Sequence, residues 1–134
     1  MDDLIKMTPN PERAKNIILQ TELRLKDAKN KDPAEFATLI IEAYYEVIKE
    51  LLTALLAVDG YKTLSHTTLI DYLREHYENQ FTDHDLHTID ELRKTRNRIA
   101  YEGFMVTRDY HDRKTATALS IIAKLKQVVQ TKIS

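Results

Sequence analysis

The residues of this sequence best suited to chemistry are four basic side chains that occur close together, Arg93, Lys94, Arg96 and Arg98, with Asn97 among them. Arginine keeps its charge at any ordinary pH, and its planar fork matches the oxygens of a phosphate. This basic cluster therefore predicts contact with the phosphates of an RNA. For Lys94 and Arg98 the favoured interpretation is a solvated helix face paired with nearby carboxylates, so Arg93 and Arg96 are the predicted RNA-binding residues.

Arg96 holds an unexpected place in the periodic pattern of its own segment. Ile89, Leu92 and Ala100 recur at helical spacing and define one apolar face. With Ile89 as the origin of an ideal helix, Arg96 lies near ~340°, in the middle of that face, and Arg93 near ~40°. A buried arginine without a partner is costly. The sequence leaves open a buried carboxylate partner, a snorkelling side chain, or a face that lines a cleft or a subunit interface.

The elements that must position these residues are all predicted to be helices. The chain has two glycines and three prolines, and all of them lie between periodic segments. No segment shows a convincing period of two, so the predicted fold is all-α: an antiparallel up-and-down bundle of four to five helices in a single domain, 1–134. The stretch from Phe36 to Leu56 carries the widest apolar stripe and is expected to form the central helix. The other predicted helices begin near Pro11, Ser65 or Thr67, Thr82 and Thr107.

Composition limits the classes of function that the chain can have. Its net charge is −1, so no global basic field indicates nucleic acid, and RNA contact would need a local patch. The absence of cysteine excludes disulfides and thiolate metal sites. Residues 1–4 are acidic without an apolar run, and the longest apolar stretch, residues 51–58, is too short to span a bilayer. We therefore expect a cytoplasmic protein with no membrane partner.

The histidines are further candidates for acid–base or metal chemistry. His84, His87 and Glu91 are spaced to share a helix face, which would suit a metal, but surface histidines at a helix start are the favoured interpretation. No metal and no cofactor is predicted. His66 is in phase with the apolar stripe of its helix, where a capping or packing role is favoured. His111 could reach the basic cluster if its helix starts beside the end of the preceding one.

Residues 96–103, Arg-Asn-Arg-Ile-Ala-Tyr-Glu-Gly, resemble the motif of the HEPN family of helical domains. In that family a late helix of a four- or five-helix bundle carries an arginine, usually followed by a polar residue, then four to six residues and a histidine. The segment 60–66 is also similar to the family's link between the second and third helices. The resemblance implies a homodimer through the Arg96 face and metal-independent RNA cleavage, in which the 2′-hydroxyl attacks the adjacent phosphate.

Tyr101 stands where the histidine of the family would be. The resemblance gives Arg96, Asn97 and Tyr101 as catalytic candidates. A tyrosine has a reference pKa of about 10, so it is a poor base at neutral pH, although it can donate a hydrogen bond to a phosphate. Arg96 and Tyr101 lie roughly 140° apart on one helix, so a joint site needs two chains. The implied function is a metal-independent ribonuclease or a degenerate RNA-binding relative, with His66 or His111 as possible substitutes for the histidine.

A non-catalytic interaction module is the alternative function. A subset of the family pairs with nucleotidyltransferases in toxin–antitoxin modules, and there a tyrosine two residues after the histidine serves as a modification target. Gly103 occupies that position here, so the chain departs from the pattern of this subset. In the alternative, the helix face around Arg96 docks a nucleotidyltransferase or another protein, and Tyr101 in place of histidine favours it.

Overall fold

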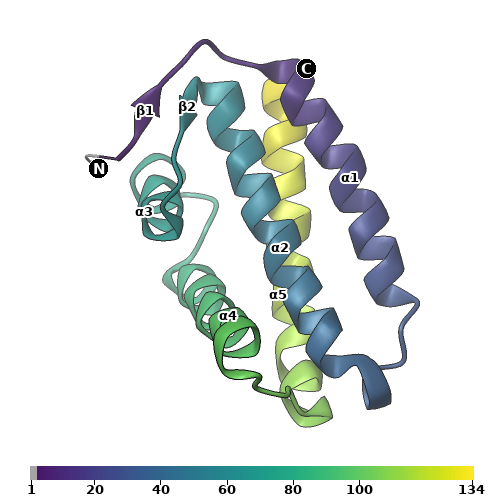
Figure 1. Cartoon of the computed structure of the whole chain (residues 1–134). Coiled ribbons are helices and arrows are strands. Elements are labelled where there is room, and N and C mark those ends of the chain that lie inside the picture. Colours follow the sequence, from purple (N-terminus) through teal and green to yellow (C-terminus); the bar gives the residue numbers. More distant parts are fainter. Residues whose placement is uncertain (1–2) are drawn as a thin grey trace.

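The computed structural model describes residues 3–134, in which five α-helices and a short two-stranded ribbon form the fold (Figure 1). The helices are α1 (Pro11–Lys29), α2 (Pro33–Asp59), α3 (His66–His76), α4 (Asp83–Glu102) and α5 (Arg108–Ile133). The strands β1 (Ile5–Lys6) and β2 (Tyr61–Lys62) pair antiparallel. Residues 1 and 2 of the acidic N-terminal stretch lie outside the described residues. The predicted all-α bundle is confirmed, and the ribbon was not predicted because two residues are too few to show a period.

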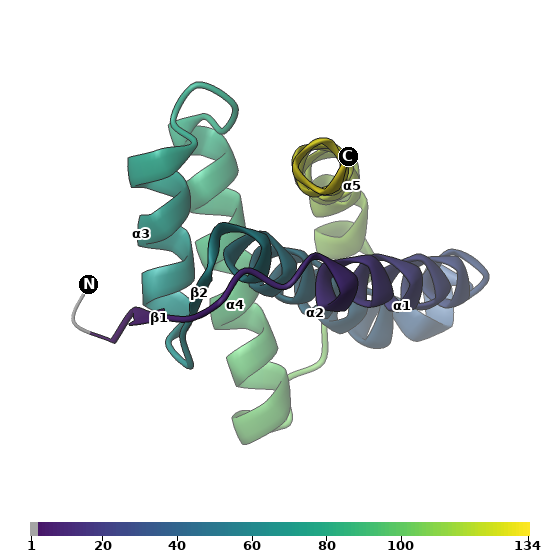
Figure 2. The same ribbon diagram turned by 90° about the horizontal axis from the view of Figure 1, so that it is seen from above.

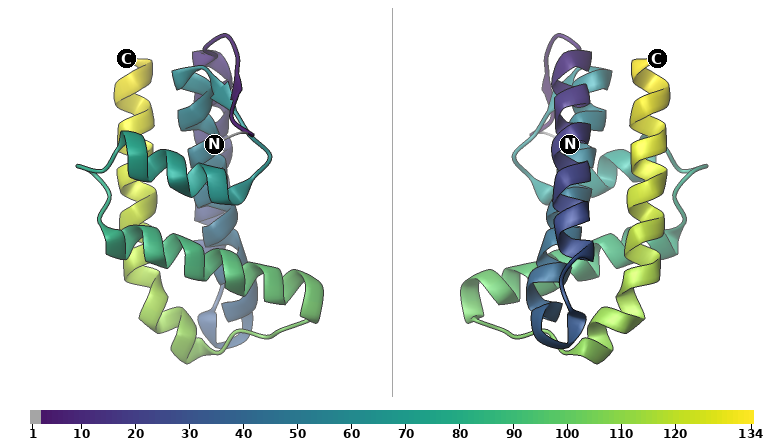
Figure 3. Two further views of the ribbon diagram at one scale, coloured as in Figure 1. Left: turned by 90° about the vertical axis from the view of Figure 1, so that its left-hand side faces the viewer. Right: turned by 90° about the vertical axis from the view of Figure 1, so that its right-hand side faces the viewer.

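The axes of α1, α2 and α5 run along one direction, and α3 and α4 cross them (Figure 3). α1 runs antiparallel to α2, whereas α2 and α5 run parallel. The hydroxyl of Thr38, near the start of α2, accepts a hydrogen bond from the backbone of Val106, just before α5. At the other end Asp59 pairs with Lys132. α3 and α4 return the chain across the bundle, and the end of α4 extends beyond the other helices (Figure 2).

α2 is the central helix of the bundle, as its wide apolar stripe predicts. It packs against each of the other four helices, and many of its side chains are fully buried, among them Ile41, Ile48, Leu51 and Leu55. Burial of each such side chain contributes about 1.5–3 kcal/mol. Leu39 belongs to the same predicted stripe but is 47% exposed, close to the departure from helical geometry at Phe36. Within residues 3–134, no helix has both the length and the apolar character that crossing a membrane requires.

Side-chain caps explain where the helices begin. A polar side chain before each helix accepts a hydrogen bond from a backbone N–H of the first turn, which satisfies a donor that the helix itself leaves unpaired. These caps are Asn10, Asp32, Ser65, Thr82 and Thr107. Thr82 and Asp85 form a capping box at the start of α4. Gly60 and Gly103 end α2 and α4 in the left-handed region, with φ of 89° and 68°.

Candidate functional site

The surroundings of Arg96 are formed where α4 crosses α2. Arg96 Nε lies 3.3 Å from Glu46 Oε1, and about a quarter of each side chain is exposed. The other carboxylate oxygen of Glu46 lies 3.1 Å from Lys49 Nζ. Of the alternatives that the sequence leaves open for Arg96, a carboxylate partner is therefore present. The spacing of Glu46 and Lys49 puts them opposite the apolar stripe of α2, and no local signal in the sequence shows that α4 crosses there.

The pair of Arg96 and Glu46 leaves hydrogen-bonding capacity unused. Within the part of the chain that the structure describes, Arg96 Nε and Glu46 Oε1 are buried without an aligned hydrogen bond, and so is Glu50 Oε2 one turn further along α2. Arg96 Nη1 donates a hydrogen bond to Asn97 Oδ1 at 3.5 Å, which is long for such a bond. A guanidinium has five N–H donors. Arg96 can therefore still donate to an external anion.

Arg93 lies one turn before Arg96 and is held by Asp90. Its Nε and Nη2 each lie 3.0 Å from Asp90 Oδ1, and a quarter of its side chain is exposed. Burial opposes the ionisation of Asp90, but hydrogen bonds from Arg93 and Lys94 outweigh it, so the pKa of Asp90 is lower than usual. Because residues three apart are neighbours on a helix surface, Arg93 and Arg96 present their charges on one side of α4.

The other two members of the basic cluster differ from each other. Lys94 is mostly exposed and lies 3.2 Å from Asp90 Oδ2, as the interpretation of a solvated, paired face predicts. Arg98 was also expected to pair with a carboxylate, but its guanidinium lies over the ring of Phe104, 3.8 Å from the centroid. The turn after α4 causes this difference, because Gly103 folds Phe104 back onto the helix.

His66 is the histidine that the structure brings to this site. Its Nδ1 shares a hydrogen bond with the hydroxyl of Tyr45 on α2, and the two rings stack with centroids 5.8 Å apart. Burial lowers the pKa of His66, and the charges of Lys49, Arg96 and Arg93 lower it further, against the opposing charge of Glu46. The ring is therefore neutral at neutral pH and lies within electrostatic range of both arginines.

Tyr45 is fixed in its protonated form. Burial of its hydroxyl is the main reason why the pKa of Tyr45 rises to about 12. Tyr45 is buried in the core, next to Tyr44 of the predicted apolar stripe of α2. A polar partner at His66 follows from the position of α3 against α2 and could not be predicted from the spacing of residues.

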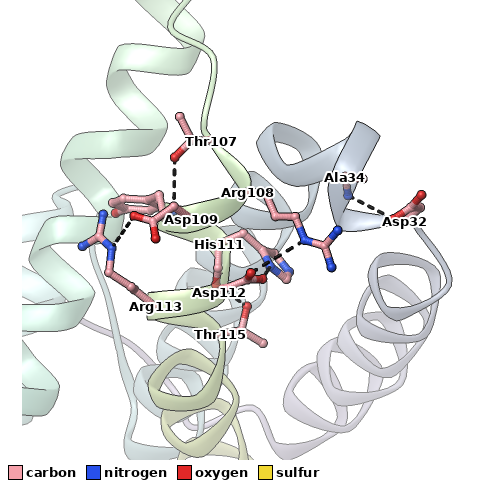
Figure 4. A network of polar contacts seen from close by, with 10 residues as sticks. Asp32, Ala34, Thr107, Arg108, Asp109, His111, Asp112, Arg113 and Thr115 are labelled. Carbon is pink, nitrogen blue, oxygen red and sulfur yellow. Dashed lines mark hydrogen bonds and ion pairs between the residues drawn. The ribbon is translucent and has the colours of Figure 1, made fainter.

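His111 lies on a different side of α2. It is buried in the first turns of α5, where its Nδ1 is 2.9 Å from Asp112 Oδ1 and its ring stacks on Tyr44. Figure 4 shows this network, in which Arg108 also approaches Asp112 and Thr115 donates to the backbone oxygen of His111. Tyr44 contacts His111 while the next residue, Tyr45, contacts His66. The structure therefore does not bring His111 to the basic cluster.

Tyr101 lies five residues after Arg96 on α4, so these two side chains do not face each other, although the resemblance groups Arg96, Asn97 and Tyr101 as catalytic candidates. Tyr101 is 79% exposed in the last turn of α4, which extends beyond the bundle (Figure 2). Ala100 is exposed as well, which corrects its expected inward position. The fully buried residues of α4 end at Leu92, and Ile99 further along the stripe is partly buried against the core. Among these three residues, a hydrogen bond joins Arg96 and Asn97.

The histidines at the start of α4 form ordinary polar contacts. His87 Nε2 lies 3.0 Å from Glu91 Oε1, and Lys114 approaches the other oxygen of Glu91 at 3.1 Å. His84 is exposed. Within residues 3–134, no three side chains of the metal-binding types gather in a way that could hold an ion.

Comparisons of this chain with known protein families and with curated proteins give no match. The chemistry of the site must therefore be argued from its own residues. Two half-buried arginines lie side by side, one of them with unused donors, and a neutral histidine lies within reach of their charges. Such an arrangement can bind an anion and exchange a proton near neutral pH.

Proposed function

We propose that this chain is an HEPN-like protein directed at RNA, either as a metal-independent ribonuclease or as a degenerate RNA-binding relative. The observation that carries the proposal is the pair of Arg93 and Arg96, held on one side of α4 with a quarter of each side chain exposed. Arginine forks bind phosphate oxygens in a bidentate manner, and phosphate contacts supply most of the affinity for a nucleic acid. The RNA backbone is therefore the proposed ligand of this pair.

Binding of a phosphate at Arg96 requires competition with Glu46. Their contact is 3.3 Å long and lacks the alignment of a hydrogen bond, so little is lost when Arg96 turns its donors toward a phosphate. Lys49 keeps an ion pair with Glu46 in that state. Because the carboxylate stays paired, the exchange does not leave an isolated buried charge, which would be costly.

A homodimer through the α4 face is part of the same proposal. Tyr101 is 79% exposed and Met105 70% exposed at the projecting end of α4 and the turn that follows. Met105 contacts Thr38, next to the half-exposed Leu39 on α2. Exposed large side chains that gather in one region mark an interaction surface. A second copy that covers this surface would bring its Tyr101 toward Arg96 of the first.

The second candidate is a non-catalytic interaction module that pairs with a nucleotidyltransferase or another protein. The observation that favours it is Tyr101, which stands where the family has histidine and is 79% exposed. Tyrosine is common among the residues that contribute most to protein interfaces. In this candidate the same α4 surface binds a different chain.

The first experiment incubates the purified protein with a mixed single-stranded RNA pool in EDTA and also measures RNA affinity at low and high salt. It compares the wild type with Arg96→Ala and with Arg113→Ala, an exposed arginine on α5 that serves as a matched control. We expect salt-sensitive binding that is lost in Arg96→Ala and kept in Arg113→Ala.

The products separate the two forms of the proposal. Cleavage that leaves cyclic phosphate ends identifies a ribonuclease, whereas Arg96-dependent binding without cleavage identifies a degenerate relative. Equal RNA binding by the wild type and Arg96→Ala, with the fold intact by circular dichroism, would overturn the RNA-directed function. The interaction module would then be pursued by co-purification with candidate nucleotidyltransferases.

A further inference from the structure

We propose that His66 is the catalytic base of this site, with Tyr45 as its positioning residue. The inference rests on the proposed function, that Arg93 and Arg96 bind an RNA phosphodiester, and it assigns to that site a group that can move a proton. Of the candidates to replace the histidine of the family, Tyr101, His66 and His111, it selects His66. Arginines and histidine then come from one subunit.

The geometry that supports this inference is centred on α2. Tyr45 shares a hydrogen bond with His66 from α3, and the next residue, Glu46, lies 3.3 Å from Arg96 of α4. α3 thus places a histidine, and α4 an arginine, in contact with two consecutive residues of α2. His66 is only partly buried, so solvent and substrate can reach its ring.

The hydrogen bond with Tyr45 determines what His66 can do. We assign Nδ1 as the donor and the Tyr45 hydroxyl oxygen as the acceptor. A protonated imidazole has N–H donors at both nitrogens, so this bond persists when the ring takes up a proton. The lone pair of Nε2 is then free for a substrate. A fixed tautomer of this kind is what a histidine base requires.

The step is the internal attack of RNA on its own phosphate. His66 Nε2 takes the proton of the ribose 2′-hydroxyl, O2′ forms a bond to phosphorus, and the bond from phosphorus to O5′ breaks. The O5′ oxygen keeps the electron pair and takes a proton from solvent, and His66 returns its proton to solvent. Arg93 and Arg96 stabilise the charge on the phosphate oxygens. The products are a 2′,3′-cyclic phosphate and a free 5′-hydroxyl, and no cofactor is consumed.

The charged groups around His66 set the pH at which the base works. Lys49 of α2 and both arginines of α4 disfavour its protonated form, and Glu46 of α2 favours it. Together with burial they keep the pKa of His66 below its ordinary value of about 6.5. We expect the cleavage rate to rise with pH through a pKa below that value and then to level off.

The test measures RNA cleavage and RNA affinity for His66→Ala, His66→Gln and Tyr45→Phe, with His84→Ala as the matched control because His84 is an exposed histidine outside the site. Loss of a general base lowers rates by roughly 10²–10⁴-fold. We expect such a loss in both His66 variants with RNA affinity unchanged, and partial rescue of His66→Ala by added imidazole. Tyr45→Phe should shift the pH profile, because the tautomer is no longer fixed.

The possible outcomes separate this inference from the proposed function. Cleavage that is lost in Arg96→Ala but remains at the wild-type rate in His66→Gln overturns the role of His66 alone. A loss in both His66 variants that imidazole does not restore shows a structural role and also overturns it. A wild type that binds RNA without cutting it overturns the catalytic role and leaves RNA binding in place. A wild type that neither binds nor cuts overturns both proposals.

Discussion

At the scale of single residues, Asp59 shows how one carboxylate holds three parts of the fold together. Its Oδ2 accepts hydrogen bonds of 2.7 Å from both Tyr72 and Tyr77, and its Oδ1 accepts one of 2.8 Å from Lys132 of α5. Burial opposes ionisation, but the hydrogen bonds from Lys132 and the two tyrosines outweigh it, so the pKa of Asp59 is lower than usual. The charged form of Asp59 therefore stabilises the native state.

We expect Asp59→Asn to lower the free energy of unfolding by about 1–3 kcal/mol at pH 7, since it weakens a largely buried hydrogen-bonded network. The loss should depend on pH. As the pH falls, Asp59 takes up its proton at a higher pH in the unfolded state than in the folded state. The stability that this group contributes is therefore present above about pH 4 and is lost as the pH falls below that value. Urea unfolding at pH 7 and pH 3 measures the difference.

A matched control is Asp71→Asn, because Asp71 pairs with Arg74 on the exposed side of α3. That change should alter stability by less than about 0.5 kcal/mol at either pH. Equal effects of the two variants, or an Asp59→Asn effect that grows at acidic pH, would show that the network does not stabilise the fold in this way.

At the scale of elements, the start of α4 is defined by its capping box. Thr82 accepts a hydrogen bond of 3.0 Å from the backbone of Asp85, and the Asp85 side chain accepts one of 3.1 Å from the backbone of Thr82. Thr82→Ala should cost about 1 kcal/mol, whereas Thr82→Ser keeps the hydroxyl and should stay within a few tenths. Thermal unfolding followed by circular dichroism checks this order. An alanine variant as stable as the wild type would contradict it.

The same element shows where prediction from the sequence ends. The capping box was predictable because its two residues lie three apart, and local spacing decides their contact. The Asp85 side chain also accepts a hydrogen bond of 2.7 Å from Lys124 of α5, and no local pattern shows this partner. The sequence likewise offers a carboxylate as one possible partner of Arg96 but does not say which one. Glu46 and the neighbouring His66 are identified only by the packing of α4 and α3 against α2.

The two glycines that end helices should tolerate substitution differently. Both have positive φ, so alanine costs about 1 kcal/mol or more at either position. A Cβ at Gly103 would meet no atom within 4 Å, whereas a Cβ at Gly60 would lie 3.0 Å from the backbone oxygen of Met7. Gly60→Ala should therefore destabilise the protein more than Gly103→Ala in urea unfolding. The reverse order would mean that the backbone at Met7 moves away from the new Cβ without loss of stability.

At the scale of the whole molecule, the proposed homodimer makes a prediction about mass in solution. The double change Tyr101→Glu with Met105→Glu places charges on the surface at the end of α4 and should convert a dimer into a monomer, since like charges at an interface are unfavourable. Light scattering coupled to gel filtration measures the mass. Leu19→Glu, at an exposed leucine on α1, is the control and should leave the dimer intact. A wild type that is monomeric at every concentration tested contradicts the dimer.

The direction of the helices was less predictable than their existence. The starts of the helices follow from caps and prolines close to each start, and the sequence shows them directly. The parallel alignment of α2 with α5, and the crossing of α3 and α4, depend on contacts between distant segments. The exposure of Ala100 has the same origin, because α4 continues past the helices that could bury it.

The pairing of Asp59 with Lys132 also has a consequence for the order in which the chain folds. These residues are 73 positions apart, whereas α1 and α2 are joined by a short turn. Closing a long loop costs more chain entropy than closing a short one, and distant contacts slow folding. We therefore expect the hairpin of α1 and α2 to acquire amide protection first in pulse-labelling hydrogen exchange. α5 should dock last, so a ribosome would have to release α5 before the native core could close.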